Sequence, residues 1–219
     1  MKIAVITANM GKFENPLPYV KQSFLYDFYM FDDENFPPRF QAMTPRLQAR
    51  IPKMFGWQMV PGYDYYIWVD ASCSLQHQDS VKWFIEQCTG CDLAVFKHPT
   101  RNTIQEEADY LRHRVAINCE YILSRYKNEL IDDQMTAIRE DKEYIDNQLF
   151  ASTAFVYNNN DRVRNMLIQW WYHTSRFHTV DQLSLPYVLY KSKCTYNVIP
   201  VPMKQNVIKS PYVTHVRYR

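Results

Sequence analysis

The segment YDYYIWVDASCSL, residues 63–75, constrains the fold more than any other stretch of the chain. Aromatic and aliphatic side chains follow one another in it, so a strand here must be covered on both faces by other layers. The run ends at Asp70, and small residues follow. Because a buried strand does not tolerate an unpaired charge, we expect Asp70 at the carboxyl end of the strand, the edge at which open α/β sheets bind ligands.

Segments typical of strands and of helices alternate along the whole chain, which predicts a layered α/β fold. A helix is expected to begin with Thr44 as N-cap and Pro45 as its first residue, and to end early at Pro52. The other expected strands cover residues 2–8, 23–31, 92–98, 149–157 and 195–202, and further helices cover 80–88, 131–144, 161–177 and a short segment from Asp181.

A long amphipathic helix is predicted after residue 103. Thr103 and Glu106 fit the capping box T-x-x-E, which gives Glu106 a structural role. Behind this start, apolar residues recur at helical spacing through Val115 as far as Ile122.

The composition favours a single domain and excludes several classes of protein. The chain has 219 residues, 47% of them hydrophobic, which is enough for one substantial core. The net charge of +2 does not indicate a nucleic-acid partner. No apolar run reaches the length of a membrane span or signal peptide, so we expect a cytoplasmic protein without a membrane span in this chain.

Five cysteines, an odd number in a chain of this size, argue against a disulfide framework. Cys88 and Cys91 form the pattern CTGC, but a zinc site needs a second pair. A redox motif would open a helix, whereas this one closes the helix expected at 80–88. We therefore interpret the pair as packed thiols at a turn from helix to strand.

Only four glycines occur, and neither a G-x-G-x-x-G fingerprint nor a Walker loop can be assembled from them. Dinucleotide-dependent oxidoreductases and P-loop NTPases are therefore poor hypotheses. If this chain binds a phosphate, side chains or a metal ion must hold it.

Asp70-Ala71-Ser72 resembles the D-x-D motif of nucleotide-sugar glycosyltransferases, with the second acid replaced. Mg²⁺ and Mn²⁺ take one or two carboxylates and complete their shell with phosphate and water, so Asp70 and Ser72 are candidate metal ligands. Arg46 and Arg50 share one helix face and Lys53 follows, which places three cations where they can surround a diphosphate. An acid at a strand end and a solvated basic helix face are the ordinary alternatives.

Several further motifs occur in an order typical of one family. ITANMGKFENPLP and MFDDENF precede R-x-x-x-R-x-x-K and Y-x-Y-x-I-W-V-D, and H-P-x-R, E-E-A and D-Q-L-S follow. The chain resembles the hexosyltransferase-like family, formerly a domain of unknown function, that includes plant seed-mucilage proteins. It is also similar to the N-terminal glycosyltransferase domain of a chlorovirus protein that builds capsid glycans.

The resemblance implies a GT-A fold, a single α/β/α sandwich with a mostly parallel sheet over residues 1–219. Residues 203–219 would form a C-terminal flap over the donor site. The implied activity is transfer of a hexosyl or deoxyhexosyl group from a nucleotide-diphosphate sugar, with UDP as the expected nucleotide and Mn²⁺ or Mg²⁺ as cofactor. The implied acceptor is an oligosaccharide or glycoprotein glycan. The location would be the host cytoplasm if the chain is viral, and the partners would include further domains of a longer polypeptide.

The resemblance also assigns roles to individual residues. Asp70 and Ser72 would bind the metal, with Ala71 between them and His215 as a further ligand. The donor would contact the ends of the first two strands, the basic helix, the segment after the strand at 92–98, and the start of the last helix. These donor-binding residues are Thr7, Ala8, Asn9, Asp32 or Asp33, Arg46, Arg50, Lys53, His98, Arg101, Glu107 and Gln182.

The catalytic base is the least defined assignment. If the reaction inverts the anomeric centre, a base must deprotonate the acceptor hydroxyl, and Asp181 is the candidate, with Asp146 as its rival. If the reaction retains the configuration, Asp181 would hold the donor sugar. A non-catalytic nucleotide-sugar binding module stays open because the second acid of D-x-D is missing. A sugar-nucleotide pyrophosphorylase is disfavoured, since it needs a glycine-rich loop and only Gly11 is available.

Overall fold

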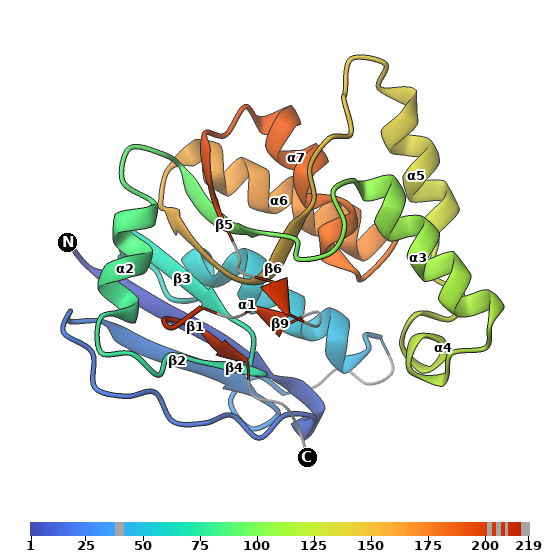
Figure 1. The fold of residues 1–219 in the computed structure, drawn as a ribbon. Coiled ribbons are helices and arrows are strands. Elements are labelled where there is room, and N and C mark those ends of the chain that lie inside the picture. The colour runs from blue at the N-terminus through green and yellow to red at the C-terminus, as the bar shows by residue number, and fades with distance from the viewer. Residues whose placement is uncertain (38–41, 201–202, 205–206, 209, 216–219) are drawn as a thin grey trace.

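The centre of the computed structural model, which describes residues 1–37, 42–200, 203–204, 207–208 and 210–215, is a six-stranded sheet (Figure 1). The strand order is β2-β1-β3-β6-β5-β7. Only β6 runs antiparallel to its neighbours, so the mostly parallel sheet predicted from the sequence is confirmed. The strands are β1 (Ile3–Asn9), β2 (Asp27–Asp32), β3 (Tyr65–Val69), β5 (Leu93–Lys97), β6 (Phe150–Asn158) and β7 (Tyr196–Ile199).

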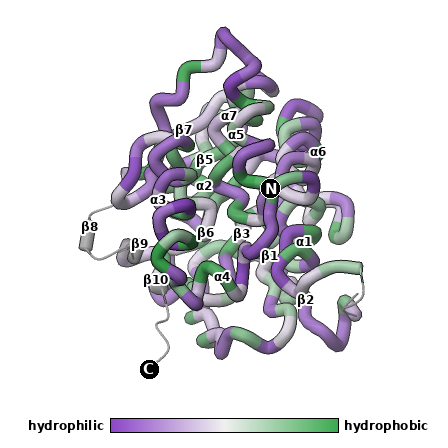
Figure 2. The backbone as a smooth tube through the Cα atoms, turned by 90° about the vertical axis from the view of Figure 1, so that its right-hand side faces the viewer, coloured by the Kyte–Doolittle hydropathy of each residue, from purple (hydrophilic) through white to green (hydrophobic). Residues whose placement is uncertain are grey.

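Helices cover both faces of this sheet, which gives the expected α/β/α sandwich. The helix α2 (Ser80–Gln87) packs on one face. The opposite face is covered by α1 (Pro45–Met59), α6 (Asp161–Arg176) and α7 (Leu185–Ser192). Figure 2 shows hydrophobic segments in the interior around β3, β5 and β6, and hydrophilic segments on the outside.

The apolar run in β3 is buried on both faces, as its composition predicts. Trp68 belongs to the core beneath α1 and α6, whereas Ile67 and Val69 belong to the core beneath α2. Successive side chains of a strand point to opposite faces, so an uninterrupted apolar run supplies both cores.

Pro52 lies inside α1 and does not end it, so the prediction of a short helix is wrong. Thr44 caps the helix as expected, accepting a hydrogen bond from the Leu47 amide (3.2 Å). An internal proline removes one helical hydrogen bond, but burial of Pro52 and Gly56 against the sheet offsets that loss. A Cβ on Gly56 would lie 2.4 Å from Cδ1 of Ile6, so glycine permits this close approach.

The connection from β5 to β6 is a helical excursion formed by α3 (Ile104–Ala116), α4 (Glu120–Tyr126) and α5 (Ile131–Glu140). It lies beside the sheet in Figure 1 and has a hydrophobic cluster of its own. The predicted long helix is in fact two, because the chain turns at Asn118 with a positive φ of 53°. Val115 is exposed, so its assignment to the apolar stripe was wrong.

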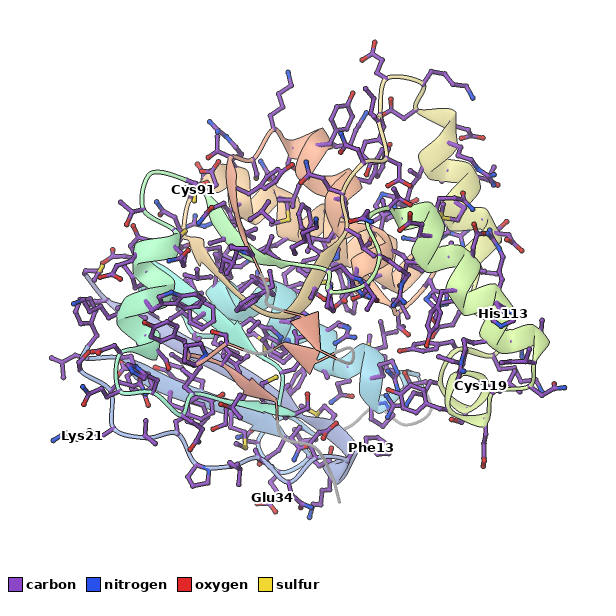
Figure 3. All side chains as sticks on the ribbon, viewed as in Figure 1. Phe13, Lys21, Glu34, Cys91, His113 and Cys119 are labelled. Carbon is purple, nitrogen blue, oxygen red and sulfur yellow. The ribbon has the colours of Figure 1, made fainter. Side chains whose placement is uncertain are left out.

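The CTGC pair closes α2, as predicted. Cys88 is the C-cap of that helix, Cys91 precedes β5, and both are free thiols (Cys91 is labelled in Figure 3). Burial raises the pKa of Cys88 to about 12, so its thiol is a packing group and not a nucleophile.

The C-terminal segment adds short strands that the sequence does not predict. β8 (Met203–Lys204) pairs with β9 (Val207–Ile208), and β10 (Thr214–His215) pairs antiparallel with β4 (Cys73–Ser74). Tyr212 stacks on Trp83 of α2 with ring centroids 4.6 Å apart. The described part of this segment is therefore anchored beside the residues that follow Asp70.

Candidate active site at the carboxyl edge of the sheet

The candidate site lies at the edge where β1, β2, β3 and β5 end. The antiparallel strand β6 begins at the same edge, so its first residues join those strand ends. The segment η2 (Asp181–Leu183) also reaches this edge, because Ser152 of β6 donates a hydrogen bond to Asp181. Figure 3 shows Phe13 and Glu34, from the loops after β1 and β2, at the same lower side of the molecule. The topology thus gathers residues that are far apart in sequence.

Asp70 follows β3 at this edge, as predicted, and its side chain is 30% exposed. Its Oδ1 accepts a hydrogen bond from Trp68 Nε1 (2.7 Å) and lies 3.6 Å from Lys53 Nζ. The indole and the ammonium orient the carboxylate, while its exposure leaves it accessible to a ligand.

Lys53 is the most buried charge of the site, with 1% of its side chain exposed. Its Nζ lies 2.7 Å from Asp181 Oδ2 and within 6 Å of the ring centroids of Trp68, Phe155 and Trp170. The expectation that Lys53 contacts a diphosphate directly therefore needs correction, because the ammonium is enclosed. Its positive charge acts on the site through the two carboxylates.

Asp181 is held between two cations and a hydroxyl. Its Oδ2 lies 3.1 Å from Arg50 Nε and its Oδ1 accepts a hydrogen bond from Ser152 Oγ (2.6 Å). Burial raises the pKa of this carboxyl, but Arg50 and Lys53 outweigh it, so the pKa is lowered overall. A sealed carboxylate with a lowered pKa is a poor proton acceptor, and its environment favours a role in holding the two cations.

Arg46 lies one helical turn before Arg50 on the same face of α1, as predicted. Its guanidinium packs over the ring of Tyr126, 4.8 Å from the centroid, and donates to the Tyr126 hydroxyl (3.0 Å). Burial lowers the pKa of Arg46 without removing its charge. The helical excursion thus meets the basic helix at this point.

Glu129 binds the segment that leads to Asp181. Its Oε1 accepts from Thr179 Oγ1 (2.6 Å) and its Oε2 accepts from the Thr179 amide (2.8 Å). The Thr179 carbonyl in turn accepts from Arg50 (3.4 Å). Glu129 therefore fixes the loop that positions Arg50 and Asp181.

A second network surrounds Glu107, which is 3% exposed. Arg101 Nε donates to one carboxylate oxygen and Gln182 Nε2 donates to the other (2.7 Å). His98 follows β5, and its Nδ1 accepts from the amides of Thr100 and Arg101. Burial and then Arg101 lower the pKa of His98 to about 4, so the imidazole is neutral at pH 7. The predicted set of His98, Arg101, Glu107 and Gln182 is thus brought together.

The ends of β1 and β2 also lie at this edge, but their side chains make structural contacts. Thr7 is buried, which corrects its expected contact with a nucleotide, and Ala8 is buried as well. The Asn9 amide exchanges hydrogen bonds with the Glu14 backbone. Asp32 accepts from the amides of Glu34 and Asn35, and Asp33 accepts from the Gly11 amide.

Asp146 has a structural role that its place in the sequence does not reveal. Its oxygens accept hydrogen bonds from the amides of Ile104 (2.8 Å) and Gln105 (2.9 Å), so it caps α3. Thr103 accepts from the Glu106 amide, as predicted, while Glu106 accepts from Asn102 instead of completing the box at Thr103. These contacts assign Asp146 to the start of α3, and its role as the base stays a prediction.

The donor set at Asp70 fits a hard cation whose remaining ligands are phosphate and water. Within the described residues, no three His, Cys, Asp or Glu side chains form a group that could hold a metal alone. Asp70 and Ser72 offer one carboxylate and one hydroxyl. The His215 backbone pairs with Cys73, but its side chain lies outside the described part, as does the end of the expected flap.

Sequence reasoning missed Ser152, Tyr126, Glu129 and Thr179. No motif marks them, and each meets its partner only across a long separation, 129 positions for Arg50 and Thr179. The sequence contains one weak indication of Glu129 as a site residue, because it is an acid in a short connection between two predicted helices.

Comparison with known proteins places the chain in a family. No curated protein matches the sequence. A solved structure with a similar fold is titled a glycosyltransferase involved in the glycosylation of the major capsid of PBCV-1, with a TM-score of 0.48 and 8% identity, over 91% of this chain and 82% of that one. Within the described residues, no helix has the length and apolar character needed to cross a membrane. Residues 40–214 match the family TOD1/MUCI70, glycosyltransferase-like domain, and the chain belongs to this family.

Proposed function

We propose that this chain transfers a glycosyl group from a nucleotide-diphosphate sugar, with UDP as its nucleotide, to a hydroxyl of a glycan acceptor, assisted by Mg²⁺ or Mn²⁺. Family membership supports sugar transfer as the class of reaction. The observation that carries the proposal is a partly exposed carboxylate, Asp70, backed by the enclosed cations Lys53 and Arg50 at the ligand-binding edge.

The reaction needs positive charge where the diphosphate leaves. A bound cation would supply Lewis-acid stabilisation of the phosphoryl oxygens, with Asp70 and Ser72 as its protein ligands. Lys53 and Arg50, fixed by Asp181, provide a positive field that needs no rearrangement during the reaction. Arg101 and Gln182, which both donate to Glu107, would contact hydroxyls of the donor sugar, and the segment after residue 203 would cover it.

A thermal-shift screen of UDP- and GDP-sugars, each with and without MnCl₂, tests this proposal. At a ligand concentration 100-fold above Kd, binding stabilises the native state by about 2.7 kcal/mol, roughly 5–10 °C for a chain of this length. Asp70→Asn should melt like the wild type without ligand but lose the Mn²⁺-dependent shift. Asp133→Asn, an exposed acid on α5, is the matched control. An unchanged Mn²⁺-dependent shift in the Asp70 variant would overturn the metal assignment.

A non-catalytic binding module is the second candidate, favoured by Ser72 in place of the second acid of D-x-D. It predicts that a nucleotide sugar binds but is neither transferred nor hydrolysed across a broad acceptor panel. Release of pyrophosphate from a nucleoside triphosphate and a sugar phosphate would instead indicate a pyrophosphorylase.

A further inference from the structure

Glu129 lies in the connection between α4 and α5, and its carboxylate is partly buried but still accessible to solvent. Its side chain is 21% exposed, against 5% for Asp181 and 3% for Glu107. Asp70 is more exposed but faces Lys53 and the expected metal. A group that exchanges a proton with a substrate must be reachable, and of the three buried acids Glu129 meets that condition best.

The contacts of Glu129 favour the uptake of a proton by its carboxylate. Its Oε2 lies 3.2 Å from Nδ1 of His178, which already accepts a hydrogen bond from the Val180 amide (3.1 Å). Nδ1 of the neutral imidazole therefore carries a lone pair and no proton. Oε2 and Nδ1 are thus both acceptors in this contact, and a proton that arrives on Oε2 would share the single Nδ1 lone pair with the Val180 amide. Transfer of a proton to Glu129 therefore removes the repulsion between two acceptors.

The position of Glu129 relative to the leaving group is also suitable. The basic face of α1 runs from Arg46, which contacts Tyr126, through Arg50, which donates to the carbonyl of Thr179, the residue that Glu129 binds. It ends at Lys53, beside Asp70. Seven residues of helix span about 10 Å. A glycosyl unit whose diphosphate lies at Asp70 can therefore place its anomeric carbon between the two ends of this row.

We propose that Glu129 is the proton acceptor of the transfer reaction and that the reaction inverts the anomeric centre. This inference rests on the proposed function. As the acceptor oxygen forms its bond to the anomeric carbon, its proton passes to Glu129 Oε2. The bond from that carbon to the diphosphate oxygen breaks, and the electron pair leaves with the nucleoside diphosphate. Glu129 then returns the proton to solvent through its exposed edge.

The charges around Glu129 agree with this role. Burial raises its pKa, although hydrogen bonds from Thr179 and the charges of Arg46 and Arg50 act in the opposite direction. Burial and then Arg46 lower the pKa of His178 to about 4, so the imidazole stays neutral and can accept the hydrogen bond. Tyr126, the remaining titratable neighbour, has a raised pKa because it is buried. These directions agree with a neutral His178 beside a carboxyl group whose proton affinity is increased by burial.

The test compares Glu129→Gln with Glu120→Gln, an exposed glutamate on α4, in the full chain. A lost general base should lower kcat by about 10²–10⁴-fold. The Kd of the donor, measured by titration calorimetry, should change less than twofold, and the acid limb of the kcat/KM profile should disappear. NMR of the wild-type product should show the anomeric configuration opposite to that of the donor.

Retention of configuration would overturn the proposal, as would a Glu129→Gln enzyme with wild-type turnover and an unchanged acid limb. Loss of donor binding in this variant would assign Glu129 a structural role and overturn it too. Donor binding without transfer in the wild type would overturn the proposed function itself, which separates the two failures.

Discussion

Asp181→Asn should destabilise the protein strongly, because it leaves two buried cations facing a neutral amide. Asp181 balances Arg50 at 3.1 Å and Lys53 at 2.7 Å, and both cations are largely withdrawn from water. Removing one partner of a buried ion pair costs about 3–5 kcal/mol. For a chain of 219 residues this corresponds to a decrease in Tm of roughly 6–20 °C.

A double variant tests whether charge compensation is the cause. Lys53→Met in the Asp181→Asn background removes one charge of each sign and leaves Arg50 with Asp70. Guanidinium denaturation followed by circular dichroism gives the free energy of unfolding of the four proteins, and we expect at least about 2 kcal/mol of favourable coupling. The exposed pair Lys82–Glu86 on α2, changed to Met and Gln, is the control and should couple by under about 0.5 kcal/mol.

Two results would refute this reasoning. If Asp181→Asn lowers the free energy of unfolding by less than about 1 kcal/mol, the cations are not dependent on that carboxylate. If the double variant is as unstable as the sum of the two single variants, the cluster is not an energetic unit.

Three further predictions follow from other contacts. The folded pKa values of His98 and His178 lie near 4, below the ordinary 6.5, so the unfolded state binds more protons between these values. The free energy of unfolding should therefore fall as pH drops from about 6.5 to 4, by up to about 3 kcal/mol per histidine. In urea denaturation at several pH values, His178→Phe should show a smaller fall than the wild type, and an unchanged slope would contradict this assignment. Asp146→Ala should cost about 1 kcal/mol through loss of the α3 cap, measured by urea denaturation, while leaving the pH profile of transfer unaltered; a shifted profile would revive it as the base. Gly56→Ala should cost about 1–2 kcal/mol because its Cβ would clash with Ile6, and Ile6→Val should relieve part of that cost in a thermal melt; additive effects would argue against the clash.

The sequence predicted the local elements well where the signal is local. The apolar run of β3 has to be covered on both faces, and its residues do enter both cores. Thr44 and Thr103 cap their helices as expected, because capping depends on residues three positions apart. The same reasoning failed at Pro52, where burial against the sheet offsets a local preference that would end the helix.

The sequence predicts where the candidate site lies in the fold, but not the contacts that its side chains make. The alternation of strands and helices is enough to put Asp70, His98 and the basic helix at one edge of a sheet. It does not reveal that Lys53 is enclosed by aromatic rings, or that Asp146 caps a helix. Burial decides whether a charged side chain serves a ligand or the fold, and burial depends on packing partners from the whole chain.

What the amino-acid sequence determined by itself is the layered α/β architecture, the strand-end carboxylate and the family, because each is encoded in periodicity or in the order of motifs. Only the tertiary structure decided which acids are sealed and which can exchange a proton. Asp181 meets Lys53 and Arg50, and Glu129 meets Thr179 and His178, across gaps of dozens of residues. The pKa of a carboxyl group is set by such neighbours and by desolvation, and neither is present until the chain has folded.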